Sequence, residues 1–226
     1  ARAYAAGTPT RRDLRMEAMR GLFTDGDRKA NGATTLYVHA NDVKQIAEVI
    51  RFKRAQDLER VVLVGGADSW MMADPLRENG IAVMVQRTHT VPRFAEDDID
   101  LPYKLPKLLE DEGVEYCLQG EGRMPEMNTR NLPFYAGTAV AYGLEYEQAV
   151  RALTLSTARI LGIDDFCGSL EPGKDATLFI STGDALDMMG NAVQHAWVNG
   201  RGVVLDNKQI QLYEKYKAKY DAQRGK

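Results

Sequence analysis

The sequence predicts an α/β fold in which short parallel strands alternate with helices. Two observations support this. Four segments rich in β-branched and aliphatic residues follow one another along the chain, at 34–38, 60–66, 81–86 and 114–118. The segments between them place apolar residues at helical spacing. Consecutive strand–helix units with right-handed crossovers form either a doubly wound sheet or part of a (β/α)₈ barrel.

The first unit follows a short N-terminal helix. Thr10 is expected to cap a helix over 11–23. The strand at 34–38 then leads through His39 into a helix that starts at Asp42 and runs to residue 56, with apolar residues along one side. This is one complete strand–helix unit.

The next three units are read from apolar runs and helix-ending residues. The run 60–66 is continuously apolar, which is typical of a parallel strand buried on both faces. The remaining elements follow in chain order: a helix over 67–80 that Gly80 ends, a strand at 81–86, a long loop at 87–103, a helix near 104–112 and a strand at 114–118.

The pattern changes after residue 118, where helices are followed by antiparallel strands. Two successive helices are expected at 128–144 and 145–163. A turn rich in Gly and Pro and a strand occupy 168–181, and two short strands meet at the Asn199-Gly200 hairpin turn. An amphipathic helix at about 209–222 ends the sequence.

In both candidate architectures, ligands bind at the carboxyl ends of the parallel strands. Four short segments of this chain fall there: His39, Gly65-Gly66, Gln86 to His89, and Gln119 to Glu121. They are the predicted site.

Composition excludes some classes of protein. The 226 residues carry 29 Lys and Arg and 32 Asp and Glu, well mixed, for a net charge of −3. Nucleic-acid binding would need a concentrated basic face, so we expect no such partner. The chain has the composition of a soluble globular protein, with no apolar run of membrane-spanning length and no signal peptide at its start, which is not Met. Its compartment is not indicated, and its two cysteines follow no metal-binding spacing.

Two segments resemble a known family. The stretch "EQAVRALTLSTARILGIDDFCGSLEPGKDATLFI" and the later "VQHAWVNGRGVV" resemble the C-terminal signature of the amidohydrolase superfamily, in its imidazolonepropionase-like branch. "YVHAND" is similar to the fifth barrel strand of that family, and "EGVEYCLQGEG" lies where the eighth is expected. The resemblance runs from about Arg12 to Leu205.

The resemblance implies a fold and a domain division. The four parallel strands would be strands five to eight of a (β/α)₈ TIM-type barrel, followed by a small piece of β-sandwich. The expected division is 1–165 for the barrel part, 166–207 for the β-sandwich appendage and 208–226 for the C-terminal helix. The N-terminal half of the family fold would be absent from this polypeptide.

The family's chemistry is metal-dependent hydrolysis of C–N or related bonds, in which a divalent metal makes hydroxide available near neutral pH. The resemblance places His39 at a ligand position, and zinc is the metal expected first. The other reading of His39 is a neutral histidine hydrogen-bonded beside a helix start. Strand six ends in "VGGAD" without a histidine, and strand eight ends in "LQGEG" without an aspartate.

Further residues near the strand ends have two readings each. Glu121 is a carboxylate after strand eight, or part of a flexible turn between two glycines. His89 would contact substrate, or would be a hydrogen-bonded residue with no part in the reaction. Arg123 would pair with a substrate carboxylate, or would belong to a solvated loop. Asp42 and Asp68 are better explained as helix caps than as catalytic groups.

Two functions remain open. The first is a metal-dependent hydrolase acting on an amide, cyclic amide or peptide-like bond of a small molecule. The second is a barrel that has lost its metal site and binds a small ligand. The open strand edges of half a barrel also predict that the chain forms a homo-oligomer or pairs with an N-terminal half.

Overall fold

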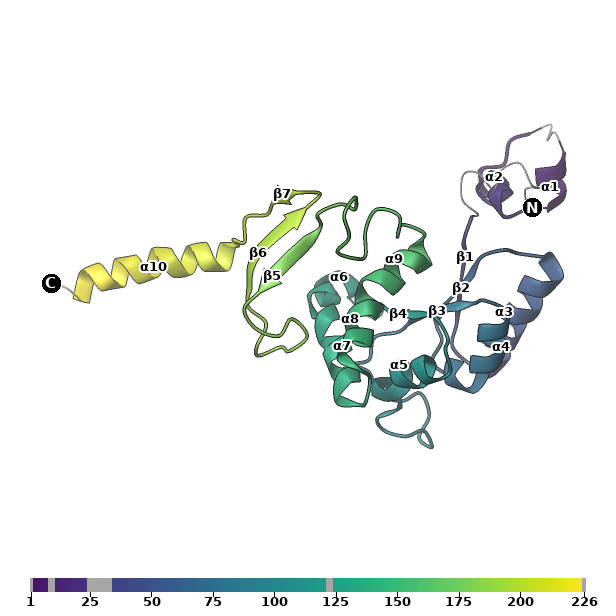
Figure 1. Cartoon of the computed structure of the whole chain (residues 1–226), viewed down its shortest axis with the longest axis horizontal. Coiled ribbons are helices and arrows are strands. Elements are labelled where there is room, and N and C mark those ends of the chain that lie inside the picture. Colours follow the sequence, from purple (N-terminus) through teal and green to yellow (C-terminus); the bar gives the residue numbers. More distant parts are fainter. Residues whose placement is uncertain (1, 8–10, 24–33, 121–123, 225–226) are drawn as a thin grey trace. The chain divides into compact units, whose positions relative to one another are not determined.

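The computed structural model describes residues 2–7, 11–23, 34–120 and 124–224 of the chain (Figure 1). The chain divides into two compact units, 1–169 and 170–226. The finer division predicted at 165/166 and 207/208 stays a prediction.

The N-terminal helix is shorter than predicted. The helix expected at 11–23 appears as α2 (Leu14–Ala18) and the 3₁₀ turn η1 (Arg20–Leu22), and a short helix that was not predicted, α1 (Arg2–Ala6), precedes it. The side chain of Asp13 accepts hydrogen bonds from the backbone N–H groups of Arg15 and Met16, so Asp13 caps α2. The predicted cap, Thr10, lies outside the described residues.

A four-stranded parallel sheet organises the first unit. Its strands are β1 (Leu36–Ala40), β2 (Val61–Gly65), β3 (Ala82–Val85) and β4 (Tyr116–Leu118). Each strand pairs with the next along the chain, and all three pairings are parallel. The α/β fold with a parallel sheet is therefore confirmed.

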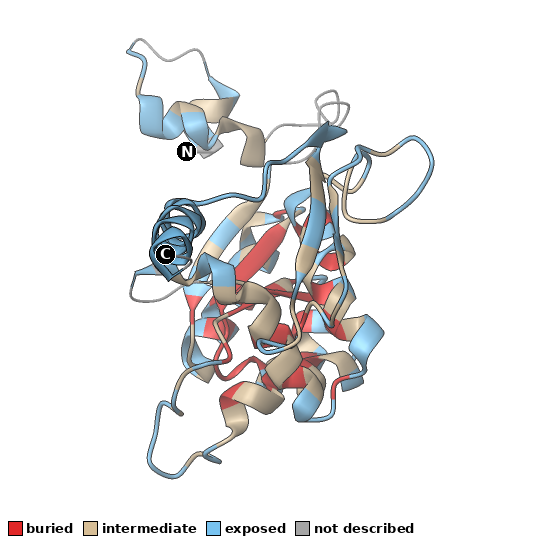
Figure 2. Ribbon diagram, turned by 90° about the vertical axis from the view of Figure 1, so that its left-hand side faces the viewer, coloured by how far each residue is buried: buried red, intermediate tan, exposed pale blue. Residues whose placement is uncertain are grey.

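Helical segments follow β1, β2 and β3. They are α3 (Val43–Gln56), η3 (Ser69–Met72) with α4 (Ala73–Glu78), and α5 (Leu101–Asp111). The helix expected at 67–80 is a 3₁₀ turn and a short α-helix, and the one expected near 104–112 begins at Leu101. A capping box starts α3, because the Asp42 carboxylate accepts from the Gln45 N–H and the Gln45 side chain accepts from the Asp42 N–H. All five residues of β2 are buried, in line with its continuous apolar run (Figure 2).

Strand register divides the parallel sheet into two faces, because successive side chains alternate. His39 pairs with Val64, Val64 with Met84, and Met84 with Cys117, so these side chains share one face, which we call the His39 face. Leu63 and Val83 point to the opposite face, where both are fully buried.

Three further helices lie beside β4 (Figure 1): α7 (Leu132–Ala141), α8 (Tyr146–Leu153) and α9 (Leu155–Leu161), preceded by α6 (Pro125–Asn128) and η4 (Thr129–Asn131). Ile160 of α9 packs against Val62 and Cys117 and so covers part of the His39 face. The single helix expected at 145–163 is broken at Thr154, whose φ and ψ are −118° and −90°. Its hydroxyl donates to the Val150 carbonyl, a bond that competes with regular helix geometry.

The second unit contains a small antiparallel sheet and a long helix. The sheet has the order β5 (Leu178–Ser181), β6 (Val193–Val198), β7 (Arg201–Gly202). Asn199 and Gly200 have φ of +51° and +75°, the left-handed values that a tight primed hairpin turn needs. The helix α10 (Lys208–Arg224) buries none of its residues (Figure 2).

Candidate functional site

The main chain after β2 turns tightly against the end of β1. Gly65 and Gly66 have positive φ, and a Cβ on Gly65 would lie 2.5 Å from Oδ1 of Asn41. The N–H of Gly66 donates to the Ala40 carbonyl at 2.8 Å, and the N–H of Ala67 donates to Oδ1 of Asn41 at 3.4 Å. These glycines allow a close approach of β2 to β1, and two of the amides beyond β2 are used within the protein rather than aimed at an anion.

His39 lies on β1, one residue before its end, and is exposed. Its neighbour across the strand pair is Val64, an apolar side chain. Tyr37 lies two residues earlier on the same face and is 39% exposed. The His39 face is thus open along β1, whereas α9 covers Val62 and Cys117 farther along it.

Asp42 and Asp68 have different roles, although both were predicted to be helix caps. Asp42 caps α3. Asp68 makes no side-chain cap bond to η3, so that prediction is wrong. Its carboxylate instead lies 3.5 Å from Nη1 of Arg93, with 11% of the Asp68 side chain and 33% of the Arg93 side chain exposed.

His89 and Thr88 attach the loop after β3 to α7. Nε2 of His89 lies 2.6 Å from Oγ1 of Thr138, and its ring meets the Tyr135 ring edge-on at 4.8 Å. Thr88 is fully buried and donates to the Tyr135 carbonyl at 3.1 Å. Partial burial, with a smaller contribution from the positive charge of Arg87, lowers the pKa of His89, which favours the neutral ring at pH 7.

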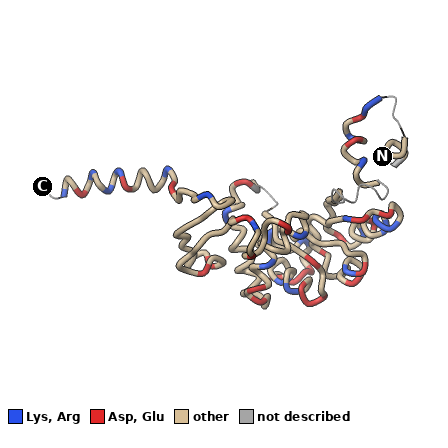
Figure 3. Tube along the Cα trace, turned by 45° about the horizontal axis from the view of Figure 1, so that its top comes forward, with Lys and Arg blue, Asp and Glu red and all other residues tan. Residues whose placement is uncertain are grey.

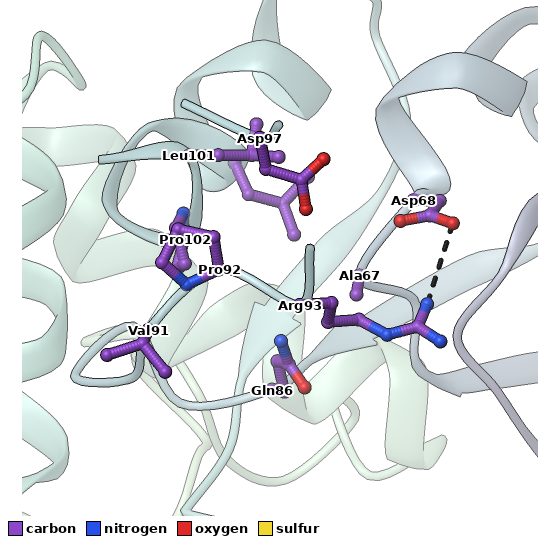
Figure 4. Close-up of a pocket in the computed structure, with 10 residues that line it drawn as sticks. Ala67, Asp68, Gln86, Val91, Pro92, Arg93, Asp97, Leu101 and Pro102 are labelled. Carbon is purple, nitrogen blue, oxygen red and sulfur yellow. Dashed lines mark hydrogen bonds and ion pairs between the residues drawn. The ribbon is translucent and has the colours of Figure 1, made fainter. Parts of the chain in front are cut away.

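A small pocket lies at the carboxyl ends of β2 and β3 (Figure 4). Polar groups reach it from Asp68, Gln86, Arg93 and Asp97, and the rest of its lining is mainly apolar, with Leu105 of α5 among it. Its volume is about 10 Å³, which is close to the space that one water molecule needs. At this volume the pocket has no room for a substrate.

The remaining predicted residues are dispersed or not described. Gln119 follows β4, and its side chain donates to the Met84 carbonyl at 2.9 Å. Glu121 and Arg123 lie outside the described residues. Burial raises the pKa of the Cys117 thiol to about 11, so this thiol is not a ready metal ligand at neutral pH.

The metal that the resemblance implies can be tested against the side chains present. Across residues 2–7, 11–23, 34–120 and 124–224, no three His, Cys, Asp or Glu side chains come together in a group that could hold a metal ion. Catalytic zinc takes about three protein ligands. Of the described residues, His39 is the one for which the resemblance predicts such a role, so these residues do not fit a complete metal centre.

Sequence reasoning missed the Asp68–Arg93 pair and the anchoring role of Thr88. The two charged residues are 25 positions apart, and no local pattern connects them. The signal available was that the loop at 87–103 contains two arginines, Arg87 and Arg93, together with the acids from Glu96 to Asp100.

Charges are interspersed along the chain. Lys and Arg alternate with Asp and Glu over the described trace, most visibly along α10 (Figure 3). None of the helices in the described ranges is both long and apolar enough to cross a membrane.

Comparison with known proteins identifies relatives. The model of the amidohydrolase family matches residues 30–203. An imidazolonepropionase of Picrophilus torridus is 35% identical over 86 residues, which are 35% of this chain and 22% of that protein. The crystal structure of an amidohydrolase from Thermotoga maritima MSB8 is similar with a TM-score of 0.73 and 27% identity, over 87% of this chain and 48% of that one.

More distant structures share the fold alone. An adenosine deaminase of Xanthomonas campestris with bound zinc gives a TM-score of 0.53 at 17% identity, over 85% of this chain and 52% of that one. The chain thus spans about half the length of the solved relatives that it matches. Because the family model covers most of the sequence, the chain belongs to the amidohydrolase family, and its resemblance to the imidazolonepropionase-like branch is confirmed.

Proposed function

We propose that β1 to β4 are strands five to eight of an amidohydrolase (β/α)₈ barrel and that β5 to β7 belong to its β-sandwich. The sheet order β1-β2-β3-β4 supports this, because consecutive barrel strands are neighbours and show no reversal of order. The solved relatives are about twice as long as the matched chain. The rest of the barrel would come from a preceding half, on the same or on another polypeptide.

In this barrel the His39 face would be the inner face, and its open part would be covered by the other half. Tyr37 and His39 are exposed there, and β1 and β4 are the edge strands of the sheet. Unpaired strand edges bind further strands readily. Pairing with the preceding half, or with a second copy of the chain, would satisfy these edges.

The activity that we propose is metal-dependent hydrolysis of a C–N bond in a small molecule, such as an amide, a cyclic amide or a peptide-like bond. The observation that carries it is the position of His39, one residue before the carboxyl end of the parallel strand β1, which is where a barrel enzyme would hold its metal. Its imidazole would be one ligand of a divalent metal, zinc first, and the remaining ligands would come from the other half. A bound metal supplies hydroxide at neutral pH.

Other residues of the chain would serve the substrate. His89 lies in the loop beyond β3 and, with its lowered pKa, is a neutral hydrogen-bonding group at pH 7. Arg123 would pair with a substrate carboxylate, and Glu121 would provide a carboxylate for proton transfer. These roles stay proposals.

One observation favours a second function. Val64 lies beside His39 where a further ligand would be needed, and no described carboxylate completes a group around it. A barrel of this kind would bind a small ligand without hydrolysing it.

The test is to produce the chain together with the preceding half of its barrel and to measure hydrolysis of a panel of dipeptides and cyclic amides. His39→Ala is expected to abolish hydrolysis. His195→Ala, in the exposed strand β6, is the matched control and should retain it. Equal activity of the two variants would contradict the assignment of His39, and ligand binding without hydrolysis in the unmutated protein would favour the second function.

A further inference from the structure

The loop between β3 and α5 crosses the carboxyl edge of the sheet and is fixed at both ends. At its start, Thr88 donates to the Tyr135 carbonyl and His89 bonds to Thr138. At its end, Lys104 of α5 pairs with Asp98 at 3.3 Å and with Asp100 at 2.6 Å. The segment between these anchors, residues 91–97, is called the strap below.

The strap is joined to the rest of the described chain by one polar contact. Nη1 of Arg93 lies 3.5 Å from Oδ2 of Asp68. Its other hydrogen bonds are internal: the Phe94 N–H donates to Asp97 Oδ2 at 3.1 Å, and the Asp97 N–H donates to the Phe94 carbonyl at 3.3 Å. The strap is thus a turn with its own internal hydrogen bonds, and a single ion pair connects it to another part of the described chain.

This ion pair is long, but breaking it would leave a nearly buried carboxylate without its partner. A distance of 3.5 Å exceeds the 2.7–2.9 Å of a good charge-assisted hydrogen bond. Asp68 is nevertheless nearly buried, and a buried carboxylate is costly when its partner leaves. Movement of the strap away from this position would therefore leave the Asp68 carboxylate nearly buried and without Arg93.

The space beneath the strap is small. The pocket between it and the strand ends has a volume of about 10 Å³, and Figure 4 shows Arg93 reaching towards Asp68 beside Gln86. The strap also exposes apolar side chains to solvent: Val91, which lines the pocket, is 74% exposed, and Phe94, which does not line it, is 48% exposed. Apolar side chains with so much exposed surface are available to cover a ligand after a movement of the strap.

We propose that residues 91–97 form a lid over the carboxyl edge of the sheet and that Asp68 and Arg93 are its latch. The lid rests on the proposed function, because that edge is where a barrel hydrolase binds its substrate. Lids of this kind exclude water when closed and admit substrate when open. Asp68 and Arg93 are positioning residues here, acting through the strap.

The experiment is hydrogen–deuterium exchange of the chain without ligand, read on peptides that contain the Phe94 and Asp97 amides. Arg93→Met and Asp68→Asn each remove the ion pair, and we expect exchange in the strap to become about fivefold faster. Arg93→Lys keeps the charge and should show a smaller increase. Arg77→Met is the matched control, since it removes an exposed pair with Asp74 on α4 and should leave the strap unchanged.

The double variant Asp68→Asn/Arg93→Met decides whether the two residues act together. If they form one latch, the double variant exchanges no faster than either single variant. Unchanged exchange in both single variants, or additive increases in the double variant, would overturn the proposal. The exchange measurement needs neither metal nor substrate, so its result does not depend on whether the protein hydrolyses anything. The test of His39 likewise does not depend on whether Asp68 and Arg93 form a latch.

Discussion

The parallel sheet of the first unit and the antiparallel sheet of the second are built from similar residues but are buried very differently. All five residues of β2 are buried, whereas Phe179 and Ile180 of β5 are each 49% exposed. Among the described residues of 170–226, Leu186 alone is buried. An apolar, β-branched segment therefore predicts a strand. Whether that strand stabilises the fold depends on the residues that pack against it.

The largest expected difference is in the free energy of unfolding lost when one apolar strand residue of each sheet is truncated to alanine. Leu63→Ala removes a fully buried side chain and should destabilise the first unit by about 3 kcal/mol. Phe179→Ala removes a half-exposed side chain and should cost less than about 1 kcal/mol in the second. Urea unfolding measures both.

The chain offers a reporter for each unit. Trp70 lies in the first unit and Trp197 in the second, so Trp197→Phe and Trp70→Phe backgrounds separate the two transitions by fluorescence. Equal costs for the two truncations would contradict the comparison.

A smaller effect is expected from a buried hydroxyl. Thr88→Val keeps the shape of the side chain but removes the hydroxyl that donates to the Tyr135 carbonyl, which should cost about 1 kcal/mol. Ser69→Ala is the control: its hydroxyl is equally buried and has no hydrogen-bond partner within the described residues. The control should be neutral or slightly stabilising in the same urea titration. A cost for Ser69→Ala as large as that for Thr88→Val would refute this account.

A third loss of stability, no larger than the second, is expected when Gly200 of the hairpin turn in the second unit is replaced by alanine. Gly200 has φ of +75°, and an alanine there adopts a left-handed conformation at a cost of roughly 1 kcal/mol. Gly202→Ala, where φ is not positive and the added Cβ meets nothing within 4 Å, should change little. Trp197 fluorescence in the Trp70→Phe background is the measurement, and a larger loss at Gly202 would exclude this explanation.

The smallest expected effect concerns the two cysteines, because thiol labelling tests whether the interior of the first unit excludes a reagent without any mutation. Burial raises the pKa of Cys117 to about 11, whereas Cys167 is only partly buried. At pH 8 an alkylating reagent should label Cys167 and spare Cys117, because the thiolate is the reactive form. Since folding raises this pKa from 9.0, the associated stability is present below about pH 9 and decreases as the pH rises towards 11. Rapid labelling of Cys117 in the folded protein at pH 8 would show that the interior is open.

Much of the fold followed from local sequence patterns. The continuous apolar run of β2, the helix cap at Asp42 and the Asn199-Gly200 turn each depend on neighbouring residues, and all three are as predicted. The break at Thr154 was not predicted, because the apolar spacing continues across it and only the threonine hydroxyl redirects the backbone.

The site was less predictable, because it depends on residues distant in sequence. His39 was predicted to follow directly after a strand at 34–38, whereas β1 runs from Leu36 to Ala40 and includes it. The environment of Asp68 was not predicted. Its partner Arg93 is brought to it by the path of the loop after β3, which no periodicity specifies. The same holds for Thr88, whose buried acceptor is the carbonyl of Tyr135, 47 residues away.

The most direct test of the central claim is the metal content of the chain, purified together with the preceding half of its barrel, by plasma mass spectrometry. The account predicts nearly one equivalent or more of a divalent metal, zinc first, with a clear loss in His39→Ala and none in His195→Ala. Equal metal content in His39→Ala and the unmutated protein, or no metal in either, would contradict the assignment of His39 as a ligand.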